Sequence, residues 1–549
     1  MDQHRVALSR GILLAALAVV PLAVLAVFFV LPVTGMVGRG LRPEGHWDLG
    51  GLPGVLGLGY IQRALWFTLW SAAAGAAISV VLGLPAAYAL HRLAFPLQRL
   101  VRAALLVPFV LPTVVVGVAF RQLMLGPLRF LHADQSAGAI LAGLVFFNVA
   151  VVIRSVGAAW EGLDRRPAEA AAALGASPTR VFLTVTLPAL RPAIVSAATV
   201  VFLFCATAYG VVLILGGLHH SNVETQIWYL TMNQFDLTGA AALALVQMAT
   251  IVVLLALAAR LRATPDPTAQ RVPARPRRPR LADVPQLAAT ALLLALVALP
   301  IVSLLVGSLR VHGTWSLANY RALQTPGTHH ALPTTATAAL AMSLRTAVGA
   351  AALAMTLGVL VAVVVTRRAQ SRLERRVRGV LDGVFMLPLG VSAVMLGLGF
   401  LITLNHPPVD FRDEPWLVDV AQALVALPLV VRILVPVLGG IDDRQRQAAA
   451  SLGASPLRAF ATVDLAVMWR PLLAAAGFAL AVSLGEFGAT SFVVPFDHPT
   501  LPVVISRLLD RPGDLNYGMA LAASCVLAAA TAVVMLLVER LRVPSLGAL

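Results

Sequence analysis

The sequence has little charge, no lysine and almost no cysteine. Charged residues make up 12% of its 549 residues, and arginine supplies every basic side chain other than histidine. Its two cysteines, Cys205 and Cys525, are too few for a disulfide framework and lack the spacing of metal ligands. No phosphate-binding loop of the form G-x-x-x-x-G-K-[S/T] occurs, so the chain itself is not a P-loop nucleotide hydrolase.

Apolar residues dominate the sequence instead. They make up 59% of the chain, with a mean hydropathy of +0.87, which is more than a soluble domain could shield from water. They fall in runs of about 20 residues, the length that crosses a bilayer core, and the short alternating segments of a β-barrel are absent. The sequence therefore predicts an all-α polytopic membrane protein with about 12 transmembrane helices. We place them at residues 11–33, 64–90, 102–125, 138–159, 192–216, 239–260, 284–309, 344–366, 379–403, 417–438, 471–495 and 516–538.

The net charge of +16 is distributed unevenly among the loops. Arg92, Arg99 and Arg102 follow the second span, whereas the loop 217–237 contains no arginine. Cytoplasmic loops of membrane proteins collect basic residues. We therefore expect a multi-pass protein of the plasma (inner) membrane with both termini in the cytoplasm, rather than a nucleic-acid-binding protein.

A segment rich in proline and arginine, 263–283, separates two similar halves, 1–262 and 284–549. Such a segment cannot pack a core or lie in lipid, so we expect an extended cytoplasmic linker, and favour a tether over a binding segment for anionic lipid. The sequence of Leu174–Pro178 recurs as Leu452–Pro456. Because each half has an even number of spans, about six, the halves should be parallel repeats.

The most informative segment lies between the fourth and fifth spans. Pro167 can begin a helix, and Glu169 would then lie at the positive end of the helix dipole. Gly175 lets the chain turn out of that helix, and Ser177 with Pro178 can begin a second one. The spacing predicts a cytoplasmic helix–turn–helix that can enter a groove on a partner.

This segment resembles the EAA loop of ABC-importer permeases, which in that family docks on the ATP-binding subunit. The resemblance covers the EAA loop 161–191 and a weaker copy, the EAA-like loop 439–470, in which Gln447 replaces the glutamate. A neutral Gln447 loses a charge-assisted contact, so the two docking contacts can be unequal. The candidate coupling residues are Glu169, Ala170, Ala171, Gly175 and Ala176 in the first loop, and Gln447, Ala448, Ala449, Gly453 and Ala454 in the second.

The fused double length and the segments Glu224–Ile227, Gly485–Gly488 and Thr500–Pro502 look like those of the thiamine and ferric-iron permeases, in a group that includes polyamine and molybdate permeases. The resemblance implies the transmembrane permease subunit of an ABC importer. Its partners would be two copies of a cytoplasmic ATPase subunit, which use ATP and magnesium, and an extracytoplasmic substrate-binding protein. The chain itself would bind membrane lipid but no cofactor. Thiamine is the first choice of substrate, and ferric iron stays open.

Three residues are candidates for the substrate path. Glu486, near the outer end of the eleventh span, either faces a cationic substrate or is a structural acid at a helix end. Tyr209 and Phe487 occupy matching positions in the two halves and are grouped with it. His219 and His220 are adjacent in an external loop, but adjacent histidines seldom converge on one ion, so we predict no metal site.

Two other protein classes fit less well. A secondary transporter of the major facilitator type also has twelve spans in two parallel halves, but it should carry a charged signature after the second span, which His91–Arg102 lacks, and has no reason for two EAA-like loops. An integral-membrane enzyme would need a constellation of histidine, aspartate or cysteine at a membrane face. The sequence shows none, so we predict no catalytic residue.

Overall fold

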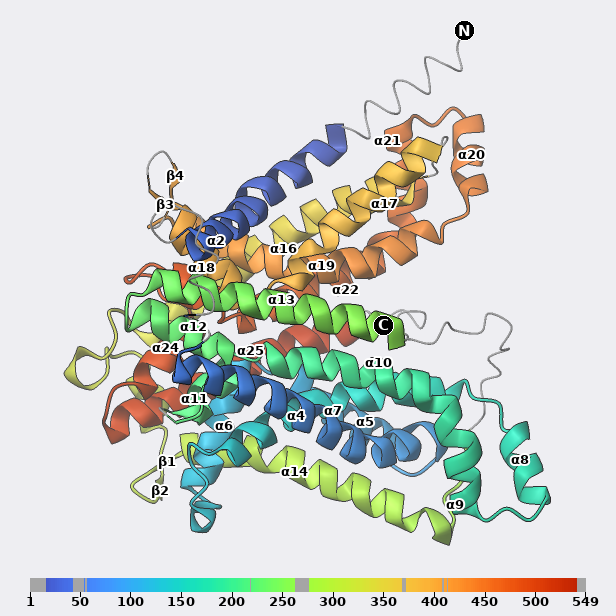
Figure 1. The fold of residues 1–549 in the computed structure, drawn as a ribbon, viewed down its shortest axis with the longest axis horizontal. Helices are drawn as coiled ribbons and strands as arrows, with labels where there is room; N and C mark the ends of the chain where they lie inside the picture. Colours follow the sequence, from blue (N-terminus) through green and yellow to red (C-terminus); the bar gives the residue numbers. More distant parts are fainter. Residues whose placement is uncertain are drawn as a thin grey trace. The chain divides into compact units, whose positions relative to one another are not determined.

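The computed structural model of this chain describes residues 16–42, 54, 57–217, 219–261, 276–367, 372–406, 409–411 and 413–540. These residues are almost wholly helical, with only two short antiparallel strand pairs (Figure 1). Ten helices among them are long and apolar enough to cross a membrane, and one bent helix pair is an eleventh candidate. The predicted all-α polytopic fold is confirmed.

The elements follow the order of the predicted spans. In the first half they are η1 (Ala26–Val30), α2 (Leu31–Leu41), α4 (Gly59–Arg92), α5 (Gln98–Val110), α6 (Thr113–Leu125), η2 (Arg129–Leu131), α7 (Ala137–Glu161), α8 (Arg166–Ala173), α9 (Pro178–Val181), η3 (Phe182–Thr186), α10 (Leu187–Ala206), α11 (Gly210–Gly216), α12 (Val223–Met232) and α13 (Leu237–Leu261). In the second half they are η4 (Leu281–Asp283), α14 (Val284–Ser308), β1 (Arg310–Val311), β2 (Thr314–Trp315), α15 (Ala318–Ala322), η5 (Thr328–His330), α16 (Ala336–Thr366), α17 (Arg372–Met386), η6 (Leu387–Gly390), α18 (Ala393–Thr403), β3 (Asn405–His406), β4 (Val409–Asp410), α19 (Trp416–Gly439), α20 (Asp443–Ser451), α21 (Pro456–Ala459), η7 (Phe460–Asp464), α22 (Leu465–Gly485), α23 (Thr490–Val493), α24 (Leu501–Leu509) and α25 (Asp514–Arg540).

The third span of each half is broken rather than continuous. In the first half α5 and α6 are separated by extended backbone at Leu111 and Pro112. Proline lacks an N–H and disfavours helical backbone in the residue before it, so a break here is expected. In the second half η6 contains Pro388, and Ser392 caps α18 by accepting a hydrogen bond from the Met395 amide at 3.1 Å.

The fifth span of each half ends earlier than the hydropathy predicts. We expected helices to residues 216 and 495, whereas α10 ends at Ala206 and α22 at Gly485. The chain then opens and resumes as the short helices α11 and α23. The first span is shifted as well, since its described helix runs from Ala16 to Leu41 instead of ending at residue 33.

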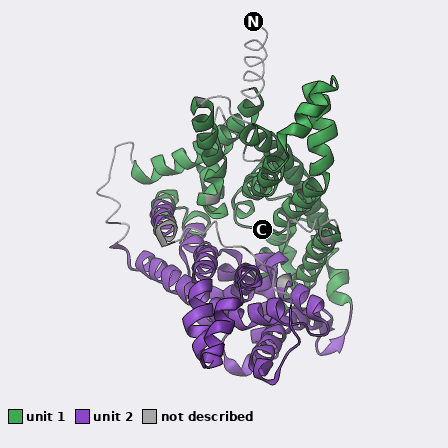
Figure 2. Cartoon of the chain, turned by 90° about the vertical axis from the view of Figure 1, so that its right-hand side faces the viewer, with its two compact units in different colours: residues 1–49, 230–242, 317–549 green, residues 50–229, 243–316 purple. Residues whose placement is uncertain are grey.

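The chain forms two compact units, coloured separately in Figure 2. Unit 1 comprises Met1–Leu49, Leu230–Ala242 and Leu317–Leu549, and unit 2 comprises Gly50–Tyr229 and Leu243–Ser316. Within unit 1, α2 packs on α18, and within unit 2, α14 packs on α4 and α6. Each sequence half therefore contributes its first long helix to the unit that the other half mainly builds. The boundaries at 262 and 284 describe the sequence repeat and stay a prediction.

Small residues allow the longest helices to pack closely. α4 packs on α7, and α16 packs on α19. A Cβ atom added to Gly83 would lie 2.8 Å from Cγ1 of Val152, and one added to Gly358 would lie 2.5 Å from Cγ1 of Val430. Helices in lipid gain stability from such close backbone approach because no hydrophobic effect drives them together. The repeat predicted from the sequence thus extends to matching glycine–valine contacts in the two units.

We expect Gly83→Leu and Gly358→Leu to destabilise the purified chain by about 1–3 kcal/mol each, because the added side chain overpacks a helix contact. Gly379→Leu is the matched control, since nothing lies within 4 Å of a Cβ added there. Thermal unfolding in detergent measures the effect. Equal melting temperatures for all three variants would show that the close contacts do not limit stability.

Candidate functional site

The first EAA loop folds as a helix, a turn and a second helix. Pro167 and Glu169 lie in the first turn of α8. Gly175 follows the helix with φ of +84°, a left-handed conformation that favours glycine. The Ala176 amide donates to the Ala171 carbonyl at 3.1 Å, which closes the end of the helix. The predicted helix–turn–helix is confirmed.

The second EAA loop repeats this geometry in α20 and α21. Gly453 has φ of +80°. Ser455 accepts a hydrogen bond from the Arg458 amide at 3.3 Å, as Ser177 does from the Arg180 amide at 3.3 Å. The candidate coupling residues therefore hold equivalent places: Glu169, Ala170 and Ala171 lie on α8, Gln447, Ala448 and Ala449 on α20, and Gly175, Ala176, Gly453 and Ala454 in the two turns.

Both loops are largely open to solvent. Neither α8 nor α20 has a buried residue. The leucines that precede the two turn glycines, Leu174 and Leu452, are each 89% exposed. In Figure 1, α8 projects past the ends of α4, α7 and α10 within its own unit. Exposed apolar side chains at a projecting turn are suited to burial against another protein.

Each turn glycine is joined to a fifth span by uninterrupted helix. α9, η3 and α10 form one helical segment, Pro178–Ala206, and α21, η7 and α22 form another, Pro456–Gly485. Both contain a π-helical turn at the same place, Phe182–Thr186 and Phe460–Asp464. Helical π-turns are rare and often accompany functional sites. Each helical segment thus runs from one EAA loop to the break in its span.

A buried ion network supports the second EAA loop. Asp464, whose side chain is 1% exposed, accepts hydrogen bonds at 2.7 Å from Arg367 at the end of α16 and from Arg446 of α20. Arg446 also donates to Asp443 at 2.7 Å and to the Leu438 carbonyl at 3.2 Å. One carboxylate thus ties α20, η7 and α16 together.

The first EAA loop is supported by aromatic contacts instead. The ring of Phe182 in η3 stacks on Trp160 at a centroid distance of 6.2 Å, and Trp160 contacts Tyr88 at 5.3 Å. Arg92 donates to the Trp160 carbonyl at 3.0 Å. The residue that corresponds to Asp464 is Thr186. The two loops have the same shape but different supports.

Glu486 lies where the fifth span of the second half is broken. Its carboxylate accepts hydrogen bonds from the amides of Ala489 at 2.8 Å and Thr490 at 3.0 Å, and also from the Thr490 hydroxyl. It therefore caps the first turn of α23. This geometry matches the helix-end alternative, and a role in the substrate path stays a prediction. Tyr209, Glu486 and Phe487 are all buried.

The corresponding break in the first half is held by a residue that the sequence analysis missed. The Asn222 side chain donates to the carbonyl of Ala208, the residue that corresponds to Glu486. Its oxygen accepts from the Thr225 amide at 3.0 Å. The nearby Glu224 is fully buried and accepts a hydrogen bond from Gln247. Polar residues in an apolar segment could have drawn attention to this cluster.

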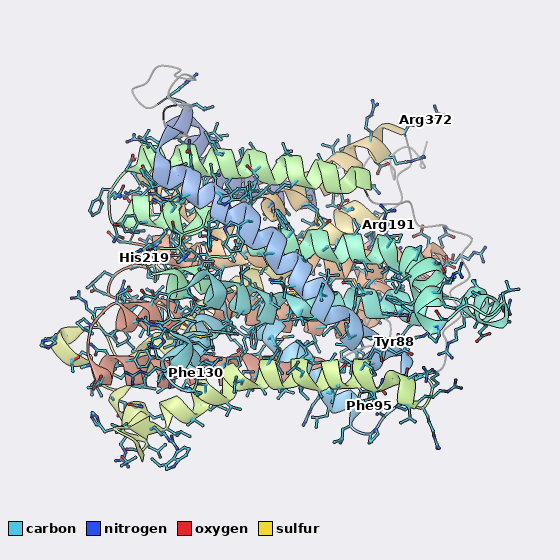
Figure 3. All side chains as sticks on the ribbon, turned by 60° about the horizontal axis from the view of Figure 1, so that its bottom comes forward. Tyr88, Phe95, Phe130, Arg191, His219 and Arg372 are labelled. Atoms are coloured by element: carbon cyan, nitrogen blue, oxygen red, sulfur yellow. The ribbon has the colours of Figure 1, made fainter. Side chains whose placement is uncertain are left out.

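The paired histidines lie far from the EAA loop of the same unit. Figure 3 shows His219 at the end of unit 2 opposite to Tyr88 and Arg191. The His220 ring lies 5.7 Å from the ring of Phe67. Among the residues that the structure describes, no group of three or more His, Cys, Asp or Glu side chains is placed to hold a metal ion.

Several known proteins are similar to this chain. It is 28% identical over 499 residues to the thiamine transport system permease protein ThiP of Brucella abortus, covering 88% of each chain. It is 28% identical over 460 residues to ThiP of Escherichia coli, covering 81% of this chain and 82% of that one. A shorter stretch of 161 residues is 33% identical to PhnV of Salmonella typhimurium, covering 29% and 60%, and the name of that permease refers to 2-aminoethylphosphonate transport.

A family model accounts for most of the chain. The model described as "binding-protein-dependent transport system inner membrane component" matches twice, at residues 79–263 and 354–542, which together exceed half of the sequence. Each match contains one EAA loop and the helical segment that follows it. The chain therefore belongs to the family of binding-protein-dependent inner membrane transport components, as a fused, double-length permease of an ABC importer.

Proposed function

We propose that this chain is the translocation subunit of an importer for thiamine. The observation that carries the proposal is similarity to thiamine permeases over 88% of both chains, across both halves and both EAA loops. Ferric iron, which the sequence resemblance left open, has no relative of that name among those described above. The buried Glu486 gives the second half an acidic group that a cationic substrate could approach when the span break opens.

Two cytoplasmic ATPase subunits would dock on the chain, one on each EAA loop. The chain has no phosphate-binding loop, so hydrolysis of ATP with magnesium falls to these partners. The projecting α8 and α20, with their exposed leucines, are the elements that a groove on each ATPase would receive. Glu169 adds a negative charge to the first contact, whereas Gln447 adds none to the second.

Closure of the ATPases would reach the substrate path through the continuous helical segments. Pro178–Ala206 has 29 residues and Pro456–Gly485 has 30, so each extends on the order of 40 Å. Each ends at a span break, beside Tyr209 in one half and Glu486 in the other. Although Pro192 and Pro471 lie inside these segments, each segment is continuously helical, so a displacement of its EAA loop would be passed on to the break at its other end.

The substrate would reach the outer face on an extracytoplasmic binding protein. If the binding protein delivers substrate to the outer face, the EAA loops and both termini would lie in the cytoplasm, as the arginine-rich loops on that side predict. The segment 217–237, which contains no arginine and includes the largely buried helix α12, would then lie on the extracytoplasmic side. In this arrangement selection of the substrate falls mainly to the binding protein.

Copurification and uptake test the proposed function. The chain should carry two copies of a P-loop ATPase from its native membrane. Proteoliposomes with this complex and its binding protein should take up labelled thiamine only with ATP, and unlabelled thiamine should compete, whereas ferric ion and 2-aminoethylphosphonate should not. Uptake of ferric ion or 2-aminoethylphosphonate instead of thiamine would identify that compound as the substrate and contradict the thiamine proposal. Uptake without ATP would favour a secondary transporter.

Replacing either turn glycine by valine should uncouple transport from ATP hydrolysis. A left-handed residue with a branched side chain costs about 1–2 kcal/mol or more, so Gly175→Val and Gly453→Val should distort the docking elements. The first variant should have the larger defect because its loop carries Glu169. Asparagine tolerates this conformation, so Gly175→Asn should retain uptake and serves as the control. Unchanged uptake in both valine variants would contradict the docking role.

Asp464→Ala should loosen the second EAA loop selectively. It leaves Arg367 and Arg446 without their shared buried partner, which costs about 3–5 kcal/mol in comparable sites. We expect faster hydrogen exchange in α20 and reduced ATP-driven uptake, with α8 unaffected. Thr186→Ala, at the corresponding position of the first half, is the control. Equal exchange in α20 of both variants would show that the network does not hold the loop.

Glu486→Gln should slow uptake severalfold while the ATPase subunits still copurify. The amide keeps an oxygen that can accept from α23 but removes the negative charge that a cationic substrate would meet. Glu486→Asp keeps the charge and should retain more uptake. Wild-type uptake by the glutamine variant would end the candidacy of Glu486 as a path residue.

A further inference from the structure

The end of the Pro/Arg-rich linker is bound to the first half. Arg277 forms a parallel bridge with Leu93, just after α4. The Arg277 amide donates to the Arg92 carbonyl at 3.0 Å, and the Ala94 amide donates to the Arg277 carbonyl at 2.7 Å. We expected an extended tether over 263–283. The residues before 276 lie outside the described part of the chain, but the remainder makes ordered backbone contacts.

Side chains strengthen this attachment. Two nitrogens of Arg277 donate to the two oxygens of Asp283, each at 2.7 Å. The Tyr88 hydroxyl donates to Asp283 at 2.9 Å and accepts from Arg277 at 2.9 Å. Paired bonds between guanidinium and carboxylate are strong and orient both groups. The side chain of Asp283 is 4% exposed, so its charge depends on these partners. The hydrogen bond to Asp283 also raises the pKa of Arg277.

This cluster touches the support of the first EAA loop. Tyr88 contacts Trp160, and Trp160 stacks on Phe182, which begins η3 directly after α9. Arg92, whose carbonyl binds the linker, also donates to the Trp160 carbonyl. Two contacts, one through the Tyr88 ring and one through Arg92, thus join the linker to Trp160, and the Trp160–Phe182 stack connects Trp160 to the helical segment of the first loop. All of these residues lie within unit 2.

The second half obtains its support from its own helices. Arg367 at the end of α16 and Arg446 of α20 meet Asp464, at the place where the first half has Thr186. The position that corresponds to Trp160 is Leu438, which lies in an aliphatic core cluster. Thr186 cannot form such an ion pair, and the ion pairs of the first loop lie at its start, where Glu161 meets His91 at 2.7 Å and Arg102 at 3.7 Å. The linker adds an arginine–carboxylate pair to that half.

We propose that residues 276–283 are a strap that positions the first EAA loop, with Arg277, Asp283 and Tyr88 as its positioning residues. The proposal rests on the proposed coupling function of that loop. The strap fixes the end of α4 and the Trp160–Phe182 stack, so the loop meets its ATPase in one orientation. Loosening the strap should lower the amount of substrate transported per ATP hydrolysed, while the ATPase still binds to the chain.

The test compares Arg277→Gln and Asp283→Asn with Arg278→Gln, an exposed neighbour in the same linker. Proteoliposomes measure the substrate transported per ATP hydrolysed, and hydrogen exchange reports on 276–283 and on the segment from α8 to η3. We expect the ratio to fall about fivefold or more in the first two variants, a common size for coupling between sites, with faster exchange in both segments and the ATPase still bound. Arg278→Gln should resemble the wild type.

Two further variants keep the outcome decisive. Tyr88→Phe retains the ring but loses the hydroxyl, and should show a smaller defect in the same direction even if the charge variants fold poorly. The exchanged pair Arg277→Asp with Asp283→Arg should recover part of the ratio. If exchange rises in 276–283 while α8 to η3 and the ratio stay unchanged, the strap holds only the linker and the proposal is wrong. If wild-type chain shows no ATP-coupled uptake, the proposed function fails, while the exchange data still decide whether the strap and the loop are connected.

Discussion

The structure depends on one constraint, which is that backbone polar groups inside a membrane must be satisfied by the protein itself. Continuous helices meet it without help, but every break needs a side chain or a cap. Asn222 binds the carbonyl of Ala208 at the break in the first half, and Glu486 receives the amides of α23 at the break in the second. Side chains therefore stabilise both breaks, and the candidate path residues Tyr209 and Phe487 lie at them. A substrate path can run there because the backbone is no longer closed on itself.

The two EAA loops show how one shape can be held in two ways. Their turns match to within a few degrees, with φ of +84° at Gly175 and +80° at Gly453. The second loop depends on the buried charge of Asp464, whereas the first depends on Trp160 and the linker. A buried ion network gains little net stability because desolvation offsets the attraction, but it penalises any other arrangement strongly. Aromatic stacking restricts the orientation of the two rings less than an ion pair restricts its partners. The strap of residues 276–283 can supply the additional restraint on the first loop.

Local rules made the loops predictable from the sequence, and non-local contacts made other parts unpredictable. Pro167, Gly175 and Ser177 act within a few residues of themselves, so the helix–turn–helix followed directly from their spacing. Apolar runs likewise revealed the fold class, and the recurrence of Leu174–Pro178 as Leu452–Pro456 revealed the repeat. Hydropathy failed at Ala206 and Gly485 because the apolar residues continue beyond the break, and hydropathy does not register a change in hydrogen bonding. Hydropathy also gave no sign that the first long helix of each sequence half belongs to the unit that the other half mainly builds. The linker looked solvated because its proline and arginine content excludes a core, yet Arg277 is held by a carboxylate six residues away and by the hydroxyl of Tyr88, which is distant in the sequence.

Fusion of the two halves gives the asymmetry a physical cause. Two separate permease subunits could be identical, with identical supports for their EAA loops. A fused chain has a single linker, which can return to only one half, so only one loop can draw on Arg277 and Asp283. The other must be held by its own helices, as Asp464 holds it. Loops with different restraints respond differently to the same force, and the charge difference between Glu169 and Gln447 adds to that inequality. The two ATPases that we propose would therefore act on loops with unequal restraints even if the ATPases themselves are identical.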